Sequence, residues 1–456
     1  MKKIYIIASL VALVLAAFLF VGNKLAKDAI KDQLTLLTSN GVSIQESSED
    51  STLLSSTNHY EFLVSDSQKL SMYLSQYADE QLPPYVNAML QGIEIGCDVK
   101  YNNLPFSNSL EVDIYPLSLS YDMKKELKKY DFRLFNTIDT FLQNKGLLYH
   151  LNYNLITSSF DGYIKDIEQT LQLKDGVEVV VNLKSVVFDG IGPLVAPSEL
   201  RASGDTMSFK LFDDKSEIHF SLSGIESSST FSSATSYLSS ASFQTLNIAM
   251  KEQNAQTTSI DIDDLKFNVS SSMEGPKAEV YAKSSFTKLN AKLKQLDLGM
   301  DGFNYDISVT DVDKDALEEL RVLLAQTKTN QSHQLQREIE GSVTRLLAQG
   351  LKLNIADFSV DTLSLEQSKG MRGFALQSEI ILSPNQSLQS TAQTAQMLQH
   401  LFVASSFTLS KELFVYINQQ APLSTMAMGY AKDVGDDLVF DVVLKDGKLS
   451  INGKAL

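Results

Sequence analysis

The acidic segment TDVDKDALEEL has the spacing in this chain that most resembles a metal site. Asp311, Asp313 and Asp315 alternate, as do the first ligands of a calcium-binding loop. Such a loop also requires a glycine at its sixth position and a bidentate glutamate at its twelfth, where this chain has Ala316 and Val322. The segment therefore favours a helix start, in which an aspartate caps the helix and further acids complement its dipole.

A second acidic cluster, SIDIDDL, contains Asp261, Asp263 and Asp264. These carboxylates could bind a cation or act as paired acids. In an alternating strand, however, Asp261 and Asp263 share one face and the neighbouring isoleucines share the other. A wet strand face therefore explains them without a site.

The chain lacks the local motifs of the common enzyme classes. Its five histidines are far apart and form no His-x-x-x-His or His–Glu pair, and there is no G-x-S-x-G elbow or phosphate-binding glycine loop. The serine-rich stretch SGIESSSTFSSATSYLSSASF has no evident group to activate a nucleophile, so we interpret it as a flexible or edge-forming connection between strands. We assign no catalytic, cofactor-binding or metal residue and expect no cofactor. Enzymatic activity stays open, with the balance against it.

The N-terminus resembles an export signal, because Lys2 and Lys3 precede an uncharged apolar run at residues 4–22. At about 1.5 Å per residue, a helix of this length spans roughly the hydrocarbon core of a bilayer. The small residues needed for signal cleavage are missing, and Cys97, the only cysteine, lies too far along the chain for lipidation. We predict a single-pass inner-membrane protein with a cytoplasmic N-terminus and a periplasmic body, whose first partner is the inner membrane, contacted through this N-terminal helix.

The composition narrows the partners further. The 456 residues include 39 lysines and arginines against 55 aspartates and glutamates, a formal charge of −16. Nucleic acid requires concentrated positive charge, so it is an unfavourable partner. A lipid or an envelope protein stays a possible partner for the body. One cysteine permits no intrachain disulfide, and stability must come from packing.

The periodicity predicts an α+β fold with a predominantly antiparallel β-sheet, extended or curved, with flanking helices and one N-terminal transmembrane helix. Four regions follow: the anchor and its helical continuation at 1–40, a mixed helix and strand region at 41–150, an antiparallel β-rich region at 151–310, and a helix and strand region at 311–456. Helices are expected at 67–91, with a break at Pro83-Pro84, and at 124–143, 313–350, 388–402 and 410–420.

The chain ends in the strongest local pattern of all. Leu438, Phe440, Val442 and Leu444 share one strand face, and Asp446-Gly447 predicts the tight turn of a β-hairpin. This ending, DLVFDVVLKDGKLSINGKAL, resembles the YdgA-like family of Gram-negative envelope proteins, a domain of unknown function. The segments GIESSSTFSS, LNIAM and VDTLSLEQSKGMRGFALQSEIIL are compatible with the central and late regions of that family.

The resemblance implies an inner-membrane protein with a periplasmic body and supplies no catalytic residues. Together with the pattern of amphipathic strands, it favours an envelope binding or assembly module that contacts a lipid or a protein through its sheet. The alternative is a periplasmic hydrolase with a site assembled from residues distant in sequence. That alternative predicts a histidine within hydrogen-bond reach of a serine or a carboxylate in a concave pocket.

Overall fold

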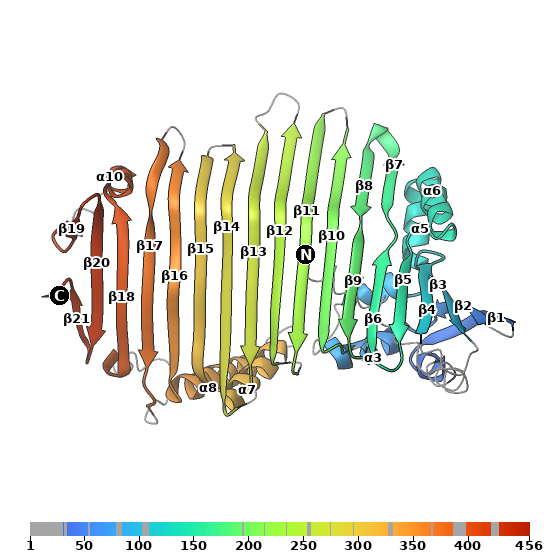
Figure 1. Cartoon of the computed structure of the whole chain (residues 1–456), viewed down its shortest axis with the longest axis horizontal. Helices are drawn as coiled ribbons and strands as arrows, with labels where there is room; N and C mark the ends of the chain where they lie inside the picture. Colours follow the sequence, from blue (N-terminus) through green and yellow to red (C-terminus); the bar gives the residue numbers. More distant parts are fainter. Residues whose placement is uncertain are drawn as a thin grey trace. The chain divides into compact units, whose positions relative to one another are not determined.

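The computed structural model describes residue 31 and residues 34–456, apart from gaps at 53–54, 79–83, 103–108, 194–195, 214, 234, 253–256, 274, 295, 327–331, 366–367, 386–397 and 421–427. The described residues form two compact units that divide after Phe231, except that Lys251 and Glu252 group with the first unit. Both units are built mainly from antiparallel strands (Figure 1).

The first unit contains a sheet in which strands mostly pair with their neighbours in sequence. Its strands are β1 (Val42–Ser51), β2 (Ser55–Val64), β3 (Glu94–Asn102), β4 (Ser109–Pro116), β5 (Tyr149–Asn154), β6 (Ser159–Ile164), β7 (Ile167–Gln172), β8 (Glu178–Lys184), β9 (Val186–Ile191), β10 (Glu199–Phe212) and β11 (Ser216–Phe231). The pairing runs β1–β2–β3–β4–β5–β6–β9–β10–β11. Strand β8 pairs with β10 beyond the end of β9, and β7 pairs with β8.

Besides the helical residues 34–39, the described helices of this unit are α3 (Ser67–Ala78), α4 (Pro84–Leu90), α5 (Tyr121–Tyr130) and α6 (Phe132–Gln143), with a short 3₁₀ turn at Lys174–Gly176. The core of the unit lies on one face of β2 to β6, where apolar residues alternate with polar ones. Phe62, Val99 and Val112 are at most 2% exposed and pack with Leu70 of α3 and Val86 of α4. Burial of each such side chain contributes roughly 1.5–3 kcal/mol.

The second unit has a sheet of unusually long strands joined by short turns. Its elements are β12 (Tyr237–Glu252), β13 (Thr258–Ser272), β14 (Lys277–Leu293), β15 (Leu296–Asp313), α7 (Lys314–Gln326), α8 (His333–Ala348), β16 (Leu351–Leu365), β17 (Ser368–Leu382), β18 (Leu401–Ser410), α10 (Lys411–Gln420), β19 (Lys432–Val434), β20 (Asp437–Lys445), β21 (Lys448–Ile451) and β22 (Lys454–Ala455). The pairing runs β12–β13–β14–β15–β16–β17–β18–β20. Strands β19 and β21 share the far edge of β20, and β22 pairs with β21.

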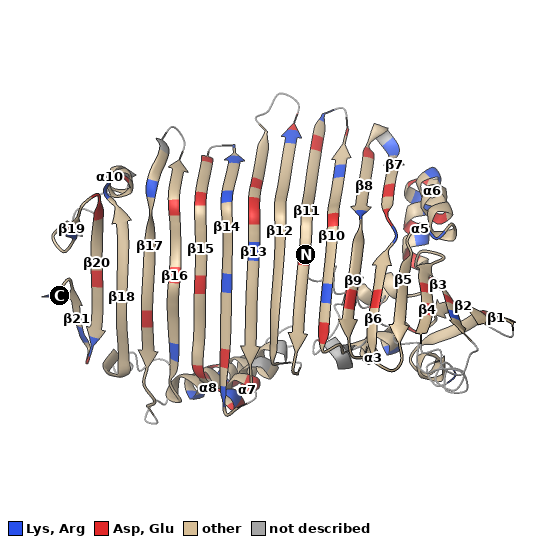
Figure 2. Cartoon of the chain, in the orientation of Figure 1, with Lys and Arg blue, Asp and Glu red and all other residues tan. Residues whose placement is uncertain are grey.

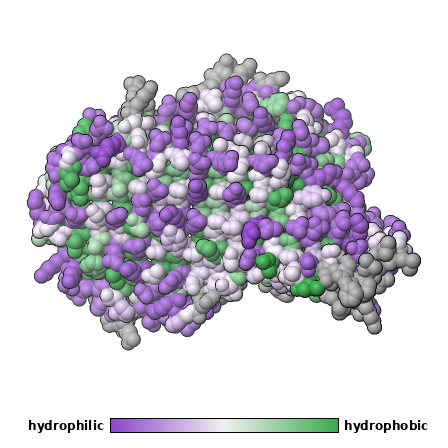
Figure 3. Space-filling model, in the orientation of Figure 1, coloured by the Kyte–Doolittle hydropathy of each residue, from purple (hydrophilic) through white to green (hydrophobic). Residues whose placement is uncertain are grey.

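Charged side chains of both signs are interspersed along these strands (Figure 2). On the face of the molecule in Figure 3, hydrophilic side chains predominate and hydrophobic ones form small patches between them. A half-wet antiparallel sheet has this appearance, because successive side chains point to opposite faces.

The structure confirms several local predictions. The helix expected at 67–91 is two pieces, α3 and α4, and α4 begins at Pro84, which suits a first helical position. The helix expected at 124–143 is also broken, because Asp131 is extended and its Oδ1 accepts hydrogen bonds from the N–H groups of Arg133 and Leu134 at the start of α6. The terminal hairpin turns at Asp446 and Gly447, both in the left-handed region, with Lys445 opposite Lys448.

Other expected helices have mixed outcomes. Helices α7, α8 and α10 lie where residues 313–350 and 410–420 predict them. The helix expected at 388–402 falls mostly outside the described residues. Of its described residues, 398–400 are helical, and the last two belong to β18, which begins at Leu401.

The predicted fold class is wrong. The described chain is mainly antiparallel β structure, with β10 to β17 each 14 to 18 residues long, rather than a sheet balanced by flanking helices. No described helix is long and apolar enough to cross a membrane. The predicted span at residues 4–22 lies outside the described residues. The sequence misled because Gly, Ser and Asp break the alternating pattern into short runs that are continuous strands in the sheet.

Candidate functional site

Six phenylalanines form a continuous series of ring contacts across the sheet of the second unit. We call this set the aromatic row; its members are Phe286 (β14), Phe303 (β15), Phe358 (β16), Phe374 (β17), Phe407 (β18) and Phe440 (β20). Successive ring centroids lie 4.7, 6.1, 5.6, 6.2 and 6.3 Å apart. These are the separations of favourable aromatic pairs.

Strand register explains why these rings meet. Phe286 lies directly opposite Phe303, and Phe407 lies directly opposite Phe440. Phe358 is opposite Leu376, one alternate position from Phe374, so those two rings meet diagonally. All six side chains therefore project from the same face of the sheet.

The aromatic row is only partly covered. Five of its rings are half-buried, whereas Phe440 is 9% exposed. At one end, Leu413 and Phe414 of α10 pack into a cluster with Phe440 and Phe407. Phe303, further along the row, is not part of that cluster. The row thus begins under a helix and continues across a more open part of the sheet.

The opposite face of the same strands is charged. Asp306, next to Tyr305 in β15, accepts a hydrogen bond from the hydroxyl of Tyr281 and lies 3.4 Å from the ammonium of Lys283. On β16 and β17, Lys352 and Glu379 are 2.5 Å apart. The face opposite the aromatic row therefore carries ion pairs between neighbouring strands.

The acidic clusters have structural roles. Asp313 caps α7, since its Oδ1 accepts a hydrogen bond from the N–H of Ala316 at 3.0 Å, as the sequence predicts. Asp261 and Asp263 lie in β13, where Asp261 accepts a hydrogen bond from Asn247, and Asp264 accepts one from Thr287. Within the described parts of the chain, no group of three acidic, histidine or cysteine side chains is arranged to hold a metal ion.

The first unit contains two histidine–aspartate pairs that the sequence did not reveal. Nδ1 of His59 lies 2.6 Å from Oδ1 of Asp98, and Nδ1 of His150 lies 2.7 Å from Oδ1 of Asp113. The four residues are opposite one another on β2, β3, β4 and β5, in a single line across the sheet. The partners are 39 and 37 residues apart, so only the strand register could have identified them.

Asp98 has the most partners of this line. Its Oδ2 accepts hydrogen bonds from Lys145 at 2.6 Å and from the hydroxyl of Tyr115 at 3.1 Å. Burial by itself raises the pKa of the Asp98 carboxyl, but the hydrogen bonds from Lys145 and His59 outweigh it and hold the pKa below its usual range. Asp98 is therefore a stable anion that orients His59.

This geometry supplies a base and its orienting carboxylate, the two supporting members of a catalytic triad. The side chain of Cys97 points to the opposite face of β3 from Asp98, into the core, and its thiol is fully buried. Burial raises its pKa, and the carboxylates of Asp98 and Asp113 raise it further. Cys97 therefore cannot act as a nucleophile that His59 activates as a base.

The remaining histidines lie elsewhere. His219 is half-buried in β11, where burial and the neighbouring Lys210 lower its pKa. His333 is the first residue of α8, and His400 precedes β18. Most of the serine-rich stretch, predicted as a flexible or edge-forming connection, lies within β11 and β12, and its described residues between them form a turn.

Comparison with known proteins gives one match. Residues 158–456 match the model of a family described as "Bacterial protein of unknown function (DUF945)", over more than half of the chain. No curated protein and no solved structure matches. The matched range begins just before β6 and includes the whole aromatic row.

Proposed function

Since the chain belongs to this bacterial family of unknown function, we propose that it is an envelope binding module that holds a lipid acyl chain against the aromatic row. The observation that carries this proposal is the unbroken series of six phenylalanine rings on one sheet face, five of them half-buried. Apolar surface of this kind gains free energy when a ligand removes it from water.

The dimensions suit an acyl chain. The row crosses six neighbouring strands, and five spacings of about 4.8 Å give a length of about 24 Å. One leaflet of a bilayer is about 15 Å deep, half of the hydrocarbon core of about 30 Å. A single acyl chain can therefore lie along the part of the row that α10 leaves open.

The charge favours recognition of the hydrocarbon rather than of an anionic headgroup. The chain has a formal charge of −16, and the ion pairs of Lys283 with Asp306 and of Lys352 with Glu379 lie on the face opposite the row. An anionic headgroup would gain little from this surface. The proposed ligand is thus selected by its apolar chain.

The test is binding of a fluorescent fatty acid to the purified full chain, with Phe303→Ser as the variant. Phe303 contacts both Phe286 and Phe358, so its loss interrupts the row. Phe132→Ser is the matched control, because Phe132 is 60% exposed on α6 in the other unit. We expect Phe303→Ser alone to weaken binding. Equal binding by wild type and a folded Phe303→Ser variant would exclude the row as the site.

We also propose that the body works in the periplasm at the inner membrane, and that the chain belongs to the YdgA-like, Gram-negative branch that its ending resembles. The support is the basic start at Lys2 and Lys3 and the uncharged run at residues 4–22. A phosphatase fusion at the C-terminus should be active, because that enzyme folds only after export. An inactive fusion with an intact chain would contradict export.

A hydrolase is the second candidate, and one observation favours it: His59 is oriented by Asp98 at 2.6 Å. Nε2 of His59 lies 3.7 Å from Glu61, so a carboxylate also flanks its free side. Assay of the purified chain against activated esters tests this reading. Ester hydrolysis by wild type that is lost in His59→Gln would support a hydrolase. Hydrolysis by wild type no faster than the uncatalysed reaction would exclude it.

A further inference from the structure

Strand β7 has a free edge. Its register with β8 is regular, from Ile167 opposite Leu183 to Gln172 opposite Glu178. On the other side, β5 pairs with β6 only as far as Ile164, and β7 continues beyond that point. Among the described residues, no strand pairs with β7 along this second edge.

The backbone groups at that edge can be assigned from the ladder. At its end, the N–H of Leu173 donates to the carbonyl of Val177. In an antiparallel ladder, alternate residues bond to the partner strand. Counting back from Leu173, the N–H and C=O groups of Glu168, Thr170 and Gln172 therefore point away from β8, toward the free edge.

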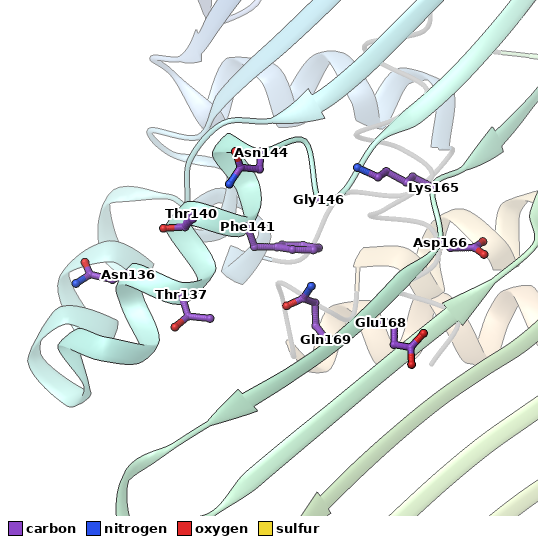
Figure 4. A pocket seen from close by; sticks show the side chains of 10 residues that line it. All are labelled: Asn136, Thr137, Thr140, Phe141, Asn144, Gly146, Lys165, Asp166, Glu168 and Gln169. Atoms are coloured by element: carbon purple, nitrogen blue, oxygen red, sulfur yellow. The ribbon is translucent and has the colours of Figure 1, made fainter.

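An open cleft of about 770 Å³ lies along this edge, between β7 and helix α6 (Figure 4). The ring of Phe141 projects from α6 into the cleft, and the amide of Gln169 points toward it from β7. Asn136 and Thr140 of α6 add polar groups to the same lining. The volume is in the range of ordinary ligand sites.

The chemistry of the lining suits a peptide backbone. Amide and hydroxyl groups both donate and accept hydrogen bonds, as a peptide group requires. The ring of Phe141 offers one apolar contact for a side chain. Lys165 is already engaged, because its ammonium donates to the carbonyl of Lys145. Among the described residues that line the cleft, no cation is therefore free to select an anion.

This edge carries fewer of the features that protect exposed edges than strand β1 does. Strand β1, the outer strand of the same unit, has a register shift between Ile44 and Glu46 and several acidic residues. Bulges and charges of this kind prevent unwanted pairing. Strand β7, IEQTLQ, has neither a proline nor a lysine, its pairing has no shift, and its one charged residue, Glu168, is paired with Lys184 of β8.

We propose that the cleft between β7 and α6 binds an extended segment of a partner protein, which adds to the free edge of β7 as an additional strand. Addition of a strand to a sheet edge is an established mode of peptide recognition, in which main-chain hydrogen bonds supply affinity and alternate side chains supply specificity. The acidic chain, with its charge of −16, favours a segment that is neutral or basic. This proposal concerns the first unit and does not depend on acyl-chain binding.

The test uses Thr170, whose side chain is exposed and whose N–H points outward. Thr170→Pro removes that N–H without breaking a hydrogen bond to β8, whereas the matched control Thr170→Ala retains it. A library of random 12-residue peptides displayed on phage is selected on the full chain, and the selected peptides are titrated against each variant. We expect Thr170→Ala to bind the selected peptides as tightly as wild type does. Thr170→Pro should bind them at least about tenfold more weakly, because one backbone hydrogen bond is lost and the adjacent ones are weakened.

Three results would overturn the proposal: selection of no binding peptide, equal binding by a folded Thr170→Pro variant, or a wild-type dimer that Thr170→Pro dissociates. The last result would show that a second copy occupies the edge. If Thr170→Pro does not fold, Phe141→Ser replaces it. Phe141→Ser removes the apolar contact on the α6 side of the cleft and should also weaken binding of the selected peptides.

Discussion

The ammonium of Lys145 lies 2.6 Å from the carboxylate of Asp98, although 47 residues separate the two in sequence. Lys145 follows α6, and Asp98 is in β3, so this contact ties the end of the helix to the sheet. The Lys145 ammonium also lies 4.1 Å from the centre of the Tyr115 ring. The backbone of Lys145 is in the left-handed region, at a φ of 52°, a conformation that needs support from such contacts.

Replacement of this lysine should destabilise the first unit. In Lys145→Met, the Asp98 carboxylate keeps its contacts with His59 and Tyr115 but loses the ammonium of Lys145. We expect the free energy of unfolding to fall by about 1–2 kcal/mol, since the pair is partly exposed to solvent. Urea denaturation measures the loss.

Lys100→Met is the matched control for that variant. Lys100 and Glu111 form a pair at 3.2 Å on the same sheet, but both side chains are about half exposed. Exposed pairs of this kind contribute little, so the change should be within about 0.5 kcal/mol. Equal losses in the two variants would show that Asp98 gains nothing from its partly buried position.

The lowered pKa of Asp98 predicts how stability depends on pH. Burial raises the pKa of the Asp98 carboxyl, but the hydrogen bonds from Lys145 and His59 lower this pKa by a larger amount. A group with a depressed pKa in the folded state stabilises the fold above its ordinary pKa, and this contribution is lost as the pH falls through the folded pKa. Asp98→Asn should therefore lose less stability than wild type between roughly pH 5 and pH 2.

Urea denaturation across that pH range measures the difference. Glu111→Gln, which removes an exposed carboxylate from the neighbouring strand β4, is the control and should follow the wild-type curve. An Asp98→Asn curve parallel to that of wild type would mean that the carboxylate is equally well stabilised in the unfolded chain.

Cys97 provides a probe of unfolding in the first unit. The thiol is fully buried, and burial together with Asp98 and Asp113 raises its pKa. Native protein should therefore react negligibly with a thiol-specific chromogenic reagent and release one equivalent once unfolded, because the chain has one cysteine. Thr137→Cys, at an exposed position on α6, should react at once with one equivalent. Rapid reaction of native wild type would contradict this burial.

Local signals allowed the caps and turns to be predicted from the sequence. The hairpin at Asp446-Gly447 and the cap at Asp313 depend on residues within a few positions of each other, and both are present. The fold class was not predictable in the same way. Strand β11 includes three serines in succession at 227–229, which have little intrinsic preference for a strand but fit a half-wet sheet.

The candidate sites depend on register over long separations. Phe303 and Phe358 are 55 residues apart in sequence, and their rings meet only because β15 and β16 pair in one particular register. A shift of one residue would turn each strand's rings to the other face. Neither the aromatic row nor the pair of His59 and Asp98 has a local pattern that could have revealed it.

The turn at Gly41, between the helical residues that precede it and β1, requires glycine for two separate reasons. Its φ is +90°, and a Cβ added there would lie 2.1 Å from the backbone oxygen of Asp66. Its carbonyl also accepts hydrogen bonds from the N–H groups of Ser65 and Asp66, which hold the two segments together.

Gly435 has a φ of +64° with no atom within 4 Å of an added Cβ. Gly435→Ala should therefore cost only about 1 kcal/mol, the cost of a left-handed residue. Gly41→Ala should cost at least about 2 kcal/mol, because the clash adds to that cost. Thermal and urea unfolding of both variants separates the two effects, and equal losses would mean that the backbone at Asp66 moves aside without cost.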